Sequence, residues 1–311
     1  MRALVTGGAG FIGSHVVDDL VAAGYQVAVV DDLSTGRREN VPSGVELVPL
    51  DIRDGSALDA TIARLRPQLV SHHAAQTSVS VSVRAPAEDA MTNLVGTVHL
   101  LEACRRHAVE RVVFASTGGA IYGEVPDGER AGLGRPPLPF SGYACAKLAA
   151  EGYLDYYRRA HGLAVAILRY ANVYGPRQDP HGEAGVVAIF VDQLAAGQPL
   201  QINARQHTGD DGCIRDYVFV GDVVRAHRQA IEGALDGRTL DVGTGVGTST
   251  RTLATTLAEE MGVDAVLHDA PPREGDVQRS VLDPAAFEEQ VGPPLALREG
   301  LRRTAESRPA G

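Results

Sequence analysis

The stretch Thr6-Gly7-Gly8-Ala9-Gly10-Phe11-Ile12-Gly13 decides the fold of this chain. It follows a short apolar run, Ala3-Leu4-Val5, and leads into a helical pattern over 14–21. A strand, a glycine turn and a helix N-terminus in this order form an anion-binding site. Glycines let the backbone approach a pyrophosphate, and the first N–H groups of the helix point at it. The stretch therefore predicts the start of a dinucleotide-binding domain.

A second predicted strand, Gln26–Val30, ends at an acidic residue, Asp31, which lies 18 residues after Gly13. Dinucleotide-binding units place at about this distance, ~20 residues on, the carboxylate that accepts hydrogen bonds from the adenosine ribose. Because a carboxylate repels a 2′-phosphate, Asp31 favours NAD over NADP. Arg37 and Arg38 follow closely and leave NADP as the less favoured alternative.

Strand-like and helix-like segments alternate through the first 170 residues, which predicts an α/β fold with a doubly wound, Rossmann-type parallel sheet. The alternation weakens after 172, which predicts a smaller C-terminal substrate lobe. The expected dinucleotide-binding domain comprises 1–171 and about 217–248, and the lobe comprises 172–216 and about 249–305. Further strands are predicted over 45–50, 68–72, 111–115, 164–169 and 239–243, and helices over 93–107 and 143–161.

The composition is that of a globular protein, with 22% charged and 44% hydrophobic residues among 311. We expect no transmembrane helix, because no apolar stretch approaches ~18 residues, and the N-terminus lacks a secretory pattern. The net charge of −10 disfavours nucleic acid and anionic membranes as partners. Cys104, Cys145 and Cys213 are too few and scattered for a disulfide framework or a metal site. These features favour a cytoplasmic protein.

Tyr143 and Lys147 are four residues apart in a predicted helix and therefore share one face. A free tyrosine titrates near pH ~10, but a neighbouring ammonium favours its phenolate. Thr117 follows the strand predicted over 111–115, and its hydroxyl can bond the same substrate oxygen. An amphipathic helix with one buried ring would show the same spacing. At the carboxyl edge of a dinucleotide-binding sheet, however, the three residues predict a catalytic base, its activating cation and a proton relay.

The motifs together resemble those of the extended short-chain dehydrogenase/reductase family, and within it the nucleotide-sugar 4-epimerases of the UDP-galactose 4-epimerase type. They include STGGAIYG at Ser116–Gly123, YACAK at Tyr143–Lys147 and RYANVYGP at Arg169–Pro176, with later motifs at Arg215–Asp222 and Arg273–Asp276. Nearly the whole chain is covered. The resemblance implies an NAD-dependent enzyme that inverts C4 of a UDP-hexose through a 4-keto intermediate. It also implies a homodimer formed by the two predicted helices.

The resemblance assigns a role to each matching residue. The implied contacts with NAD are Gly7, Gly10, Phe11, Ile12, Gly13, Asp31, Asp51, Ile52, Ala74, Ala75, Gln76, Asn93, Tyr143, Lys147 and Tyr170. The implied contacts with the UDP-sugar are Thr117, Asn172, Arg215, Arg273, Asp276 and Ser280. The glycine spacing admits a second reading, in which Gly8 replaces Gly7 as the first of the three. Thr77 stands where many members have a lysine, so one phosphate contact is missing.

Several related reactions share this fold and the Tyr/Lys pair. Dehydratases and decarboxylases of the family carry acidic residues at Gly118 and Gly119, and glycine cannot perform their acid–base steps. A UDP-glucuronate 4-epimerase is the main alternative, and an NAD(P)-dependent reductase is a weaker one. A non-catalytic NAD sensor would not need the Tyr/Lys pair. At one position of the family a tyrosine suits plain hexoses, whereas a small residue admits N-acetylated sugars. Ser280 occupies this position, so we expect UDP-GlcNAc and UDP-GalNAc to be accepted beside UDP-glucose and UDP-galactose.

Overall fold

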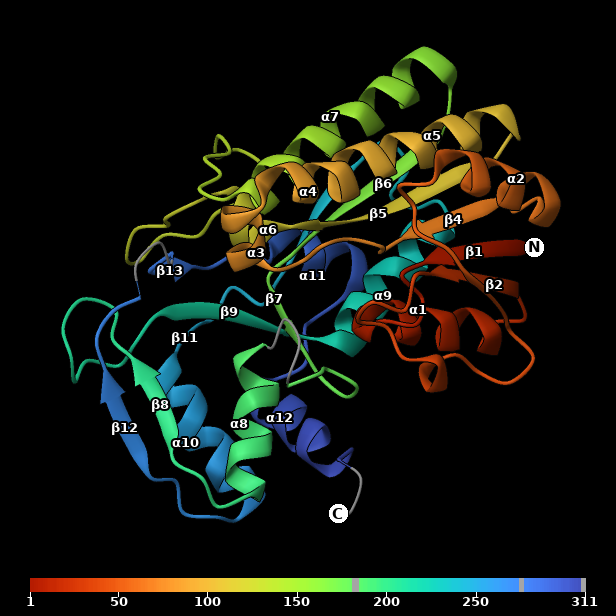
Figure 1. Cartoon of the computed structure of the whole chain (residues 1–311). Helices are drawn as coiled ribbons and strands as arrows, with labels where there is room; N and C mark the ends of the chain where they lie inside the picture. The colour runs from red at the N-terminus through yellow and green to blue at the C-terminus, as the bar shows by residue number, and fades with distance from the viewer. Residues whose placement is uncertain (181–184, 274–276, 309–311) are drawn as a thin grey trace. The chain divides into compact units, whose positions relative to one another are not determined.

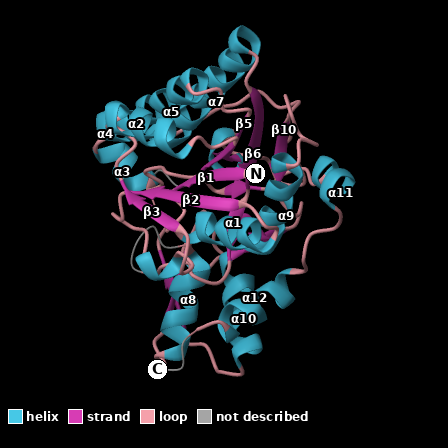
Figure 2. Ribbon diagram, turned by 90° about the vertical axis from the view of Figure 1, so that its right-hand side faces the viewer, coloured by secondary structure: helices cyan, strands magenta, loops and turns pink. Residues whose placement is uncertain are grey.

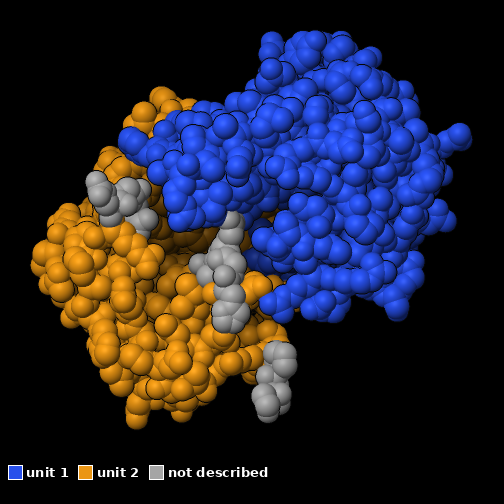
Figure 3. All heavy atoms as spheres, viewed as in Figure 1, with its two compact units in different colours: residues 1–117, 139–169, 224–240 blue, residues 118–138, 170–223, 241–311 orange. Residues whose placement is uncertain are grey.

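The computed structural model describes residues 1–180, 185–273 and 277–308, and the chain divides into two compact units (Figure 3). Unit 1 comprises 1–117, 139–169 and 224–240, and unit 2 comprises 118–138, 170–223 and 241–311. The segment Gly118–Leu138, which the sequence assigned to the dinucleotide-binding domain, thus belongs to unit 2. Backbone hydrogen bonds hold it there, since Val125 N donates to Arg279 O at 3.0 Å and Ala131 N to Val281 O at 2.8 Å.

A seven-stranded sheet with the order β10-β6-β5-β4-β1-β2-β3 organises the first unit (Figure 1). The first strand lies inside the sheet, with β2 parallel to it on one side and β4 on the other. This order confirms the doubly wound, Rossmann-type sheet expected from the sequence. The strands are β1 (Arg2–Thr6), β2 (Gln26–Asp31), β3 (Glu46–Pro49), β4 (Leu69–His72), β5 (Arg111–Thr117), β6 (Ala164–Tyr170) and β10 (Thr239–Val242).

The strands form because apolar runs are covered on both faces. All four residues of β4 are buried, and so are the last four of β1, whereas β3 at the sheet edge is only half-buried. Leu4, Val70, Val112 and Phe114 meet in one continuous core of buried side chains. Near-continuous burial of this kind is typical of parallel sheets with helices on both faces.

Helices cover both faces of the sheet (Figures 1 and 2). On one face α2 (Gly55–Leu65), α5 (Gly96–Arg106) and α7 (Gly142–His161) pack side by side. On the other face α1 (Phe11–Ala22) lies beside α9 (Val220–Ile231), and Arg228 Nε donates to Asp19 Oδ2 at 2.9 Å. Helix α7 begins after Ser141, whose Oγ accepts from Ala144 N at 3.1 Å, and ends before a left-handed Gly162.

The helix predicted over 93–107 is present as α5, and the segment between β4 and α5 is less regular. It contains α3 (Val79–Arg84), α4 (Pro86–Ala90) and a π-helical turn, η2 (Met91–Val95), which continues into α5. One buried side chain of this turn is Asn93. Single π-helical turns are rare and are found frequently at functional sites. A short 3-10 turn, η1 (Arg38–Asn40), follows β2.

Unit 2 is built around strand β9 (Ile214–Phe219). This strand pairs in parallel with β7 (Asn172–Tyr174) and β13 (Arg279–Ser280), and antiparallel with β11 (Gly247–Ser249). A separate two-stranded sheet joins β8 (Leu200–Asn203) to β12 (Leu267–Ala270). The remaining helices of the unit are α6 (Gly118–Ile121), α8 (Val186–Ala195), α10 (Thr250–Met261), α11 (Ala285–Val291) and α12 (Leu297–Glu306).

Candidate active site

The glycine turn between β1 and α1 has no room for side chains. Gly7 has a φ of +67°, and a Cβ there would lie 2.6 Å from Ala74 N. A Cβ at Gly13 would lie 2.2 Å from Gly7 O, so the start of α1 contacts the turn backbone to backbone. A Cβ at Gly8 would collide with the Val29 side chain, 2.8 Å away. Gly7 and Gly13 therefore shape the anion cradle, while Gly8 lets the turn pack on β2.

Asp31 ends β2 with its carboxylate turned to the backbone of this turn. Oδ2 accepts from Ala9 N and Oδ1 from Leu33 N, each at 2.9 Å. Burial raises the pKa of Asp31, and the two backbone N–H groups oppose that rise. Gly36 also approaches closely, because a Cβ there would lie 2.6 Å from Asp31 Oδ1. The carboxylate is thus held in place beside the cradle, where a ribose hydroxyl could donate to it.

The loop after β4 carries Gln76, which is locked to the π-helical turn by a pair of amide contacts. Gln76 N donates to Asn93 Oδ1 at 2.9 Å, and Asn93 Nδ2 donates to Gln76 O at 2.7 Å. Ala74 lies against Gly7, as the close approach of its nitrogen shows. Of the other expected cofactor contacts, Ile52 is buried against Gly96. Its neighbour Asp51 pairs with Arg53 at the surface.

His72, which sequence reasoning missed, links the glycine turn to the π-helical turn. Thr97 Oγ1 donates to Asn93 O at 2.7 Å and therefore accepts from His72 Nε2, 3.0 Å away. Nδ1 of the neutral imidazole accepts from Thr6 Oγ1 at 2.6 Å, and that hydroxyl itself accepts from Ala74 N at 3.3 Å. Burial, with a smaller effect from the Lys147 charge, holds the pKa of His72 well below its usual value. A neutral imidazole suits one accepting and one donating nitrogen.

Lys147 is buried at the carboxyl end of β5. Its Nζ donates to Ala115 O at 3.0 Å and lies 4.7 Å from the centroid of the Phe114 ring. Burial lowers the pKa of Lys147 to about 8, although the carboxylates of Asp89 and Glu151 act in the opposite direction. The ammonium form therefore predominates at neutral pH.

The two other expected catalytic residues share this edge of unit 1. Tyr143 is half-buried in the first turn of α7, one turn before Lys147. Thr117, also half-buried, is the last residue of β5, two residues after the carbonyl that accepts from Lys147. The strand end and the first turns of α7 thus bring a phenol, a hydroxyl and a buried cation to one edge of the sheet. Such a set can remove a proton from a sugar hydroxyl.

Glu151 is a further residue that sequence reasoning missed. It lies one turn after Lys147 on α7 and is almost fully buried. Its Oε1 accepts from Ser116 Oγ at 2.5 Å, and its Oε2 lies 2.6 Å from Arg169 Nη2 on β6. The buried ion pair connects α7 to β6, and the Ser116 hydrogen bond connects it to β5 next to Thr117. A charged residue on a helix pattern gives no sequence signal of such burial.

The expected sugar-nucleotide contacts that the structure describes, apart from Thr117, belong to unit 2. Arg215 is half-buried on β9, and Ser280 on β13 is its direct partner in the parallel register. Asn172 opens β7, and a Cβ at Gly119 would lie 3.2 Å from its Oδ1. The glycine thus leaves the amide accessible from that side. Ser280 itself is buried.

Arg273 is exposed, and Asp276 lies outside the described residues. With the Asn203 amide oriented so that its oxygen faces Arg273, that oxygen accepts from Nε at 3.1 Å and from Nη2 at 3.2 Å. Tyr170, the remaining expected cofactor contact, is buried at the end of β6. Phe11 and Ile12 are half-buried in the first turn of α1.

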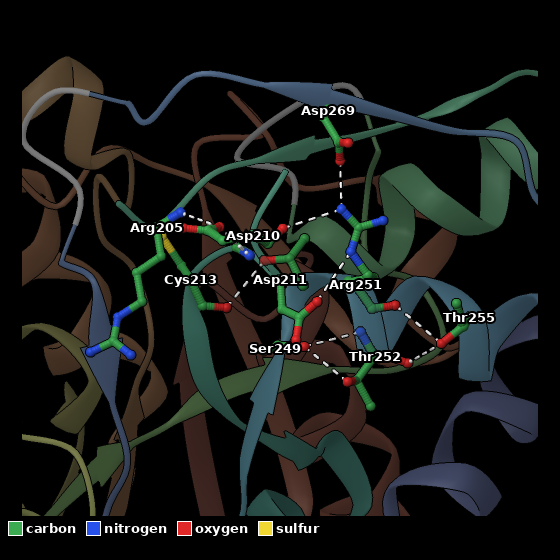
Figure 4. Close-up of polar contacts among 11 residues, drawn as sticks. Arg205, Asp210, Asp211, Cys213, Ser249, Arg251, Thr252, Thr255 and Asp269 are labelled. Carbon is green, nitrogen blue, oxygen red and sulfur yellow. Dashed lines mark hydrogen bonds and ion pairs between the residues drawn. The ribbon is translucent and has the colours of Figure 1, made fainter. Parts of the chain in front are cut away.

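Carboxylate side chains hold the loop that leads into β9 through hydrogen bonds and ion pairs (Figure 4). Although burial acts against it, four backbone N–H groups hold the pKa of Asp210 well below its usual value. They belong to Arg205, Gln206, His207 and Gly212. Arg251 bridges Asp211 and Asp269, with Nε 3.2 Å from the first and Nη2 2.5 Å from the second. These contacts hold in place the loop that precedes Arg215.

Asp216 anchors the strand itself. Its buried carboxylate accepts from the backbone nitrogens of Thr244, Gly245 and Leu282 and from Thr244 Oγ1. Burial raises the pKa of Asp216, and these hydrogen bonds oppose the rise. The neighbouring Arg215 is therefore carried by a rigid backbone, as a residue that grips a diphosphate requires.

The chain is similar to known proteins over nearly its whole length. Residues 3–243 match the NAD dependent epimerase/dehydratase family. A UDP-glucose 4-epimerase of Mycolicibacterium smegmatis is 47% identical over 313 residues, which cover 98% of each chain. The crystal structure of a Thermus thermophilus UDP-glucose 4-epimerase in complex with NAD has a TM-score of 0.95 at 52% identity, covering 99% of this chain and 98% of that one. A Thermotoga maritima UDP-glucose 4-epimerase with UDP-glucose has a TM-score of 0.92 at 46% identity and the same coverage.

Proposed function

The chain belongs to the NAD dependent epimerase/dehydratase family, and we propose that it inverts C4 of a UDP-hexose through a transient 4-keto sugar, with NAD as resident cofactor. Interconversion of UDP-glucose and UDP-galactose is the reaction that the relatives' names favour. The observation that carries the proposal is the buried Lys147 ammonium, bonded to Ala115 O at the strand end beside Thr117 and one helical turn from Tyr143.

The residues present fit a dinucleotide. The cradle formed by Gly7 and Gly13 leaves backbone N–H groups at the N-terminus of α1 free to approach a pyrophosphate. Asp31 would accept from the adenosine ribose, and Lys147 would bond the nicotinamide ribose. NAD, when bound there, would supply the hydride acceptor and donor that the inversion at the sugar C4 requires.

The chain's own residues then handle the proton and hold the substrate. Tyr143, as phenolate, removes the proton from the 4-hydroxyl, and Lys147 stabilises that phenolate. Thr117 bonds the same oxygen. Arg215 and Arg273 grip the diphosphate, and Asp276 reaches the uridine ribose, so that the hexose can turn while the nucleotide stays in place.

The protein should accept more than one UDP-sugar pair. Ser280 is small at the gate position, so we include UDP-GlcNAc and UDP-GalNAc among the substrates. A UDP-glucuronate 4-epimerase is the alternative, because Thr77, Ser78 and Arg177 are polar residues that can bind a C6 carboxylate. Gly118 and Gly119 disfavour a dehydratase, since neither can act as acid or base.

We also propose a homodimer in the cytoplasm. Helices α5 and α7 pack against each other, and α7 exposes Tyr153 and Tyr156, which suits a helical interface with a second copy. Of the described helices, none is long and apolar enough to cross a membrane. Cys104, Cys145 and Cys213 form no disulfide, which suits a reducing compartment. Light scattering on the wild type and on Tyr153→Asp tests the dimer, and a wild type of monomeric mass refutes it.

Incubation of the purified protein with UDP-glucose, without added NAD, tests the proposed reaction. Formation of UDP-galactose supports the epimerase. Consumption of added NADH or NADPH with UDP-4-keto sugars, and no UDP-galactose, would instead identify a reductase. Binding of NAD without turnover of UDP-glucose, UDP-GlcNAc or UDP-glucuronate would identify a sensor.

A further inference from the structure

Asp89, on α4, is a fully buried acidic side chain that no step described above uses. Its Oδ1 accepts from Gln76 Nε2 at 2.6 Å and from Asn93 Nδ2 at 3.0 Å. Its Oδ2 is buried without a hydrogen-bond partner among the described residues. A buried carboxylate oxygen that lacks a donor is costly unless a positive charge compensates for it.

The positive charge that acts on Asp89 is that of Lys147. Helix α4 and the π-helical turn both pack against α7, which carries this lysine. Asp89 and Lys147 interact electrostatically, so that the carboxylate favours the ammonium and the ammonium favours the carboxylate. Burial raises the pKa of Asp89, while Gln76, Lys147 and Asn93 each oppose that rise. The charge on Asp89 is therefore stabilised by Gln76, Asn93 and Lys147.

The other groups that face Lys147 cannot replace Asp89. Burial and the lysine charge lower the pKa of His72 and of His73, the latter to about 3, so both imidazoles are neutral. Glu151 favours the ammonium, but its two oxygens are engaged by Arg169 and Ser116. Asp89 keeps one oxygen without a donor, and its charge is not shared with an arginine in this way.

We propose that Asp89 is a positioning residue for the epimerisation, with two effects on residues that we expect to contact NAD. Its buried negative charge holds Lys147 as an ammonium, and its Oδ1 fixes the amides of Gln76 and Asn93. The catalytic consequence rests on the proposed function, because Lys147 affects turnover through the Tyr143 phenolate. The pairing of the Asp89 and Lys147 charges does not depend on that function.

Asp89→Asn separates charge from shape. The asparagine keeps an oxygen that can accept from Gln76 and Asn93, so only the charge is lost. We expect the alkaline limb of the kcat profile to move down by about one pH unit or more, because one opposite charge shifts a buried group by about 1–3 units. The KM for UDP-glucose should change by less than about threefold, because Lys147 acts on the chemical step rather than on the diphosphate. Glu88→Gln, an exposed neighbour on α4, is the matched control.

A loss of kcat that is uniform across pH, with the alkaline limb unmoved, would overturn the proposal and leave Asp89 as a purely structural residue. A double-mutant cycle with Lys147→Met gives a readout that does not need activity. In excess NAD at pH 7, Asp89→Asn should lower the melting temperature of wild type clearly more than that of Lys147→Met. Equal shifts in both backgrounds would also overturn the pairing. Coupled shifts in a protein without epimerase activity would refute the proposed function while leaving the pairing in place.

Discussion

Arg169 on β6 and Glu151 on α7 form a buried ion pair, in which Nη2 lies 2.6 Å from Oε2. The same carboxylate accepts from Ser116 Oγ, next to Thr117. The helix that carries Tyr143 and Lys147 is therefore joined to β6 by the ion pair and to β5 by the Ser116 hydrogen bond. Its position relative to the strand end depends on this pair.

Glu151→Gln should destabilise the protein strongly, by about 3–5 kcal/mol, because it leaves the Arg169 guanidinium buried without its counter-charge. Urea unfolding followed by circular dichroism measures this loss. Asp155→Asn is the matched control, since Asp155 is paired with Arg158 on the same helix but is exposed. Equal stability of the two variants would contradict the importance of the buried pair.

Tyr143→Phe should keep the fold and bound NAD but lose most turnover. A positioned general base contributes about 10²–10⁴ in rate, and phenylalanine retains the ring without the acidic hydroxyl. Steady-state assays with UDP-glucose measure the effect, and the absorbance of retained cofactor checks that the site is intact. A variant with more than a tenth of the wild-type rate would rule out Tyr143 as the base.

Removal of the charge at Asp31 should relax the preference for NAD. Asp31→Ala should also weaken retention of the cofactor, because Ala9 N and Leu33 N lose their acceptor. Asp31→Asn retains an acceptor, and we expect its preference for NAD over NADP to fall by about tenfold. Titration of the stripped protein with each cofactor gives the ratio. An unchanged ratio in both variants would mean that the adenosine ribose lies elsewhere.

The buried ammonium of Lys147 gives stability a defined pH dependence. Its pKa is lowered to about 8 in the folded protein, mainly by burial, whereas in the unfolded chain it titrates near its ordinary value of 10.5. Between these values the unfolded chain binds the proton and the folded protein does not, so stability rises with pH. Relative to Lys147→Met, the wild type should gain up to about 3 kcal/mol between pH 7.5 and 10.5. A pH-independent difference would contradict this.

Ser280→Tyr should reduce kcat/KM for UDP-GlcNAc by about tenfold or more relative to UDP-glucose, because a bulky residue removes the space for a C2 substituent. Turnover of UDP-glucose, UDP-GlcNAc and UDP-glucuronate on both proteins gives the comparison. Since Ser280 is buried, the melting temperature of the variant must be checked as well. Ser280→Thr is the smaller control. If a folded tyrosine variant handles UDP-GlcNAc like wild type, Ser280 does not limit the size of the sugar.

The parts of the fold that depend on local patterns could be predicted from the sequence. The run from Thr6 to Gly13 and the acid at 31 identify the nucleotide half, because glycine conformation and strand length are local properties. The placement of Tyr143 and Lys147 one turn apart on a helix could be predicted for the same reason, because four residues make about one helical turn.

The supporting residues could not be predicted, because their roles depend on tertiary contacts. Asp89, Glu151 and Arg169 look like surface charges on a helix or strand end, and only packing shows that they are buried. His72 lies in an apolar strand run, where a histidine gives no signal of its two threonine partners. The assignment of Gly118–Leu138 to unit 2 depends likewise on hydrogen bonds to residues more than 140 positions away.

Conversion of UDP-glucose labelled with deuterium at C4, without added cofactor, tests the central claim most directly. Epimerisation through resident NAD moves the label off C4 and returns it to the same carbon. We therefore predict that UDP-galactose accumulates with its deuterium retained at C4, as mass spectrometry and proton NMR would show. Absence of UDP-galactose, or a product with solvent hydrogen at C4, would contradict the account.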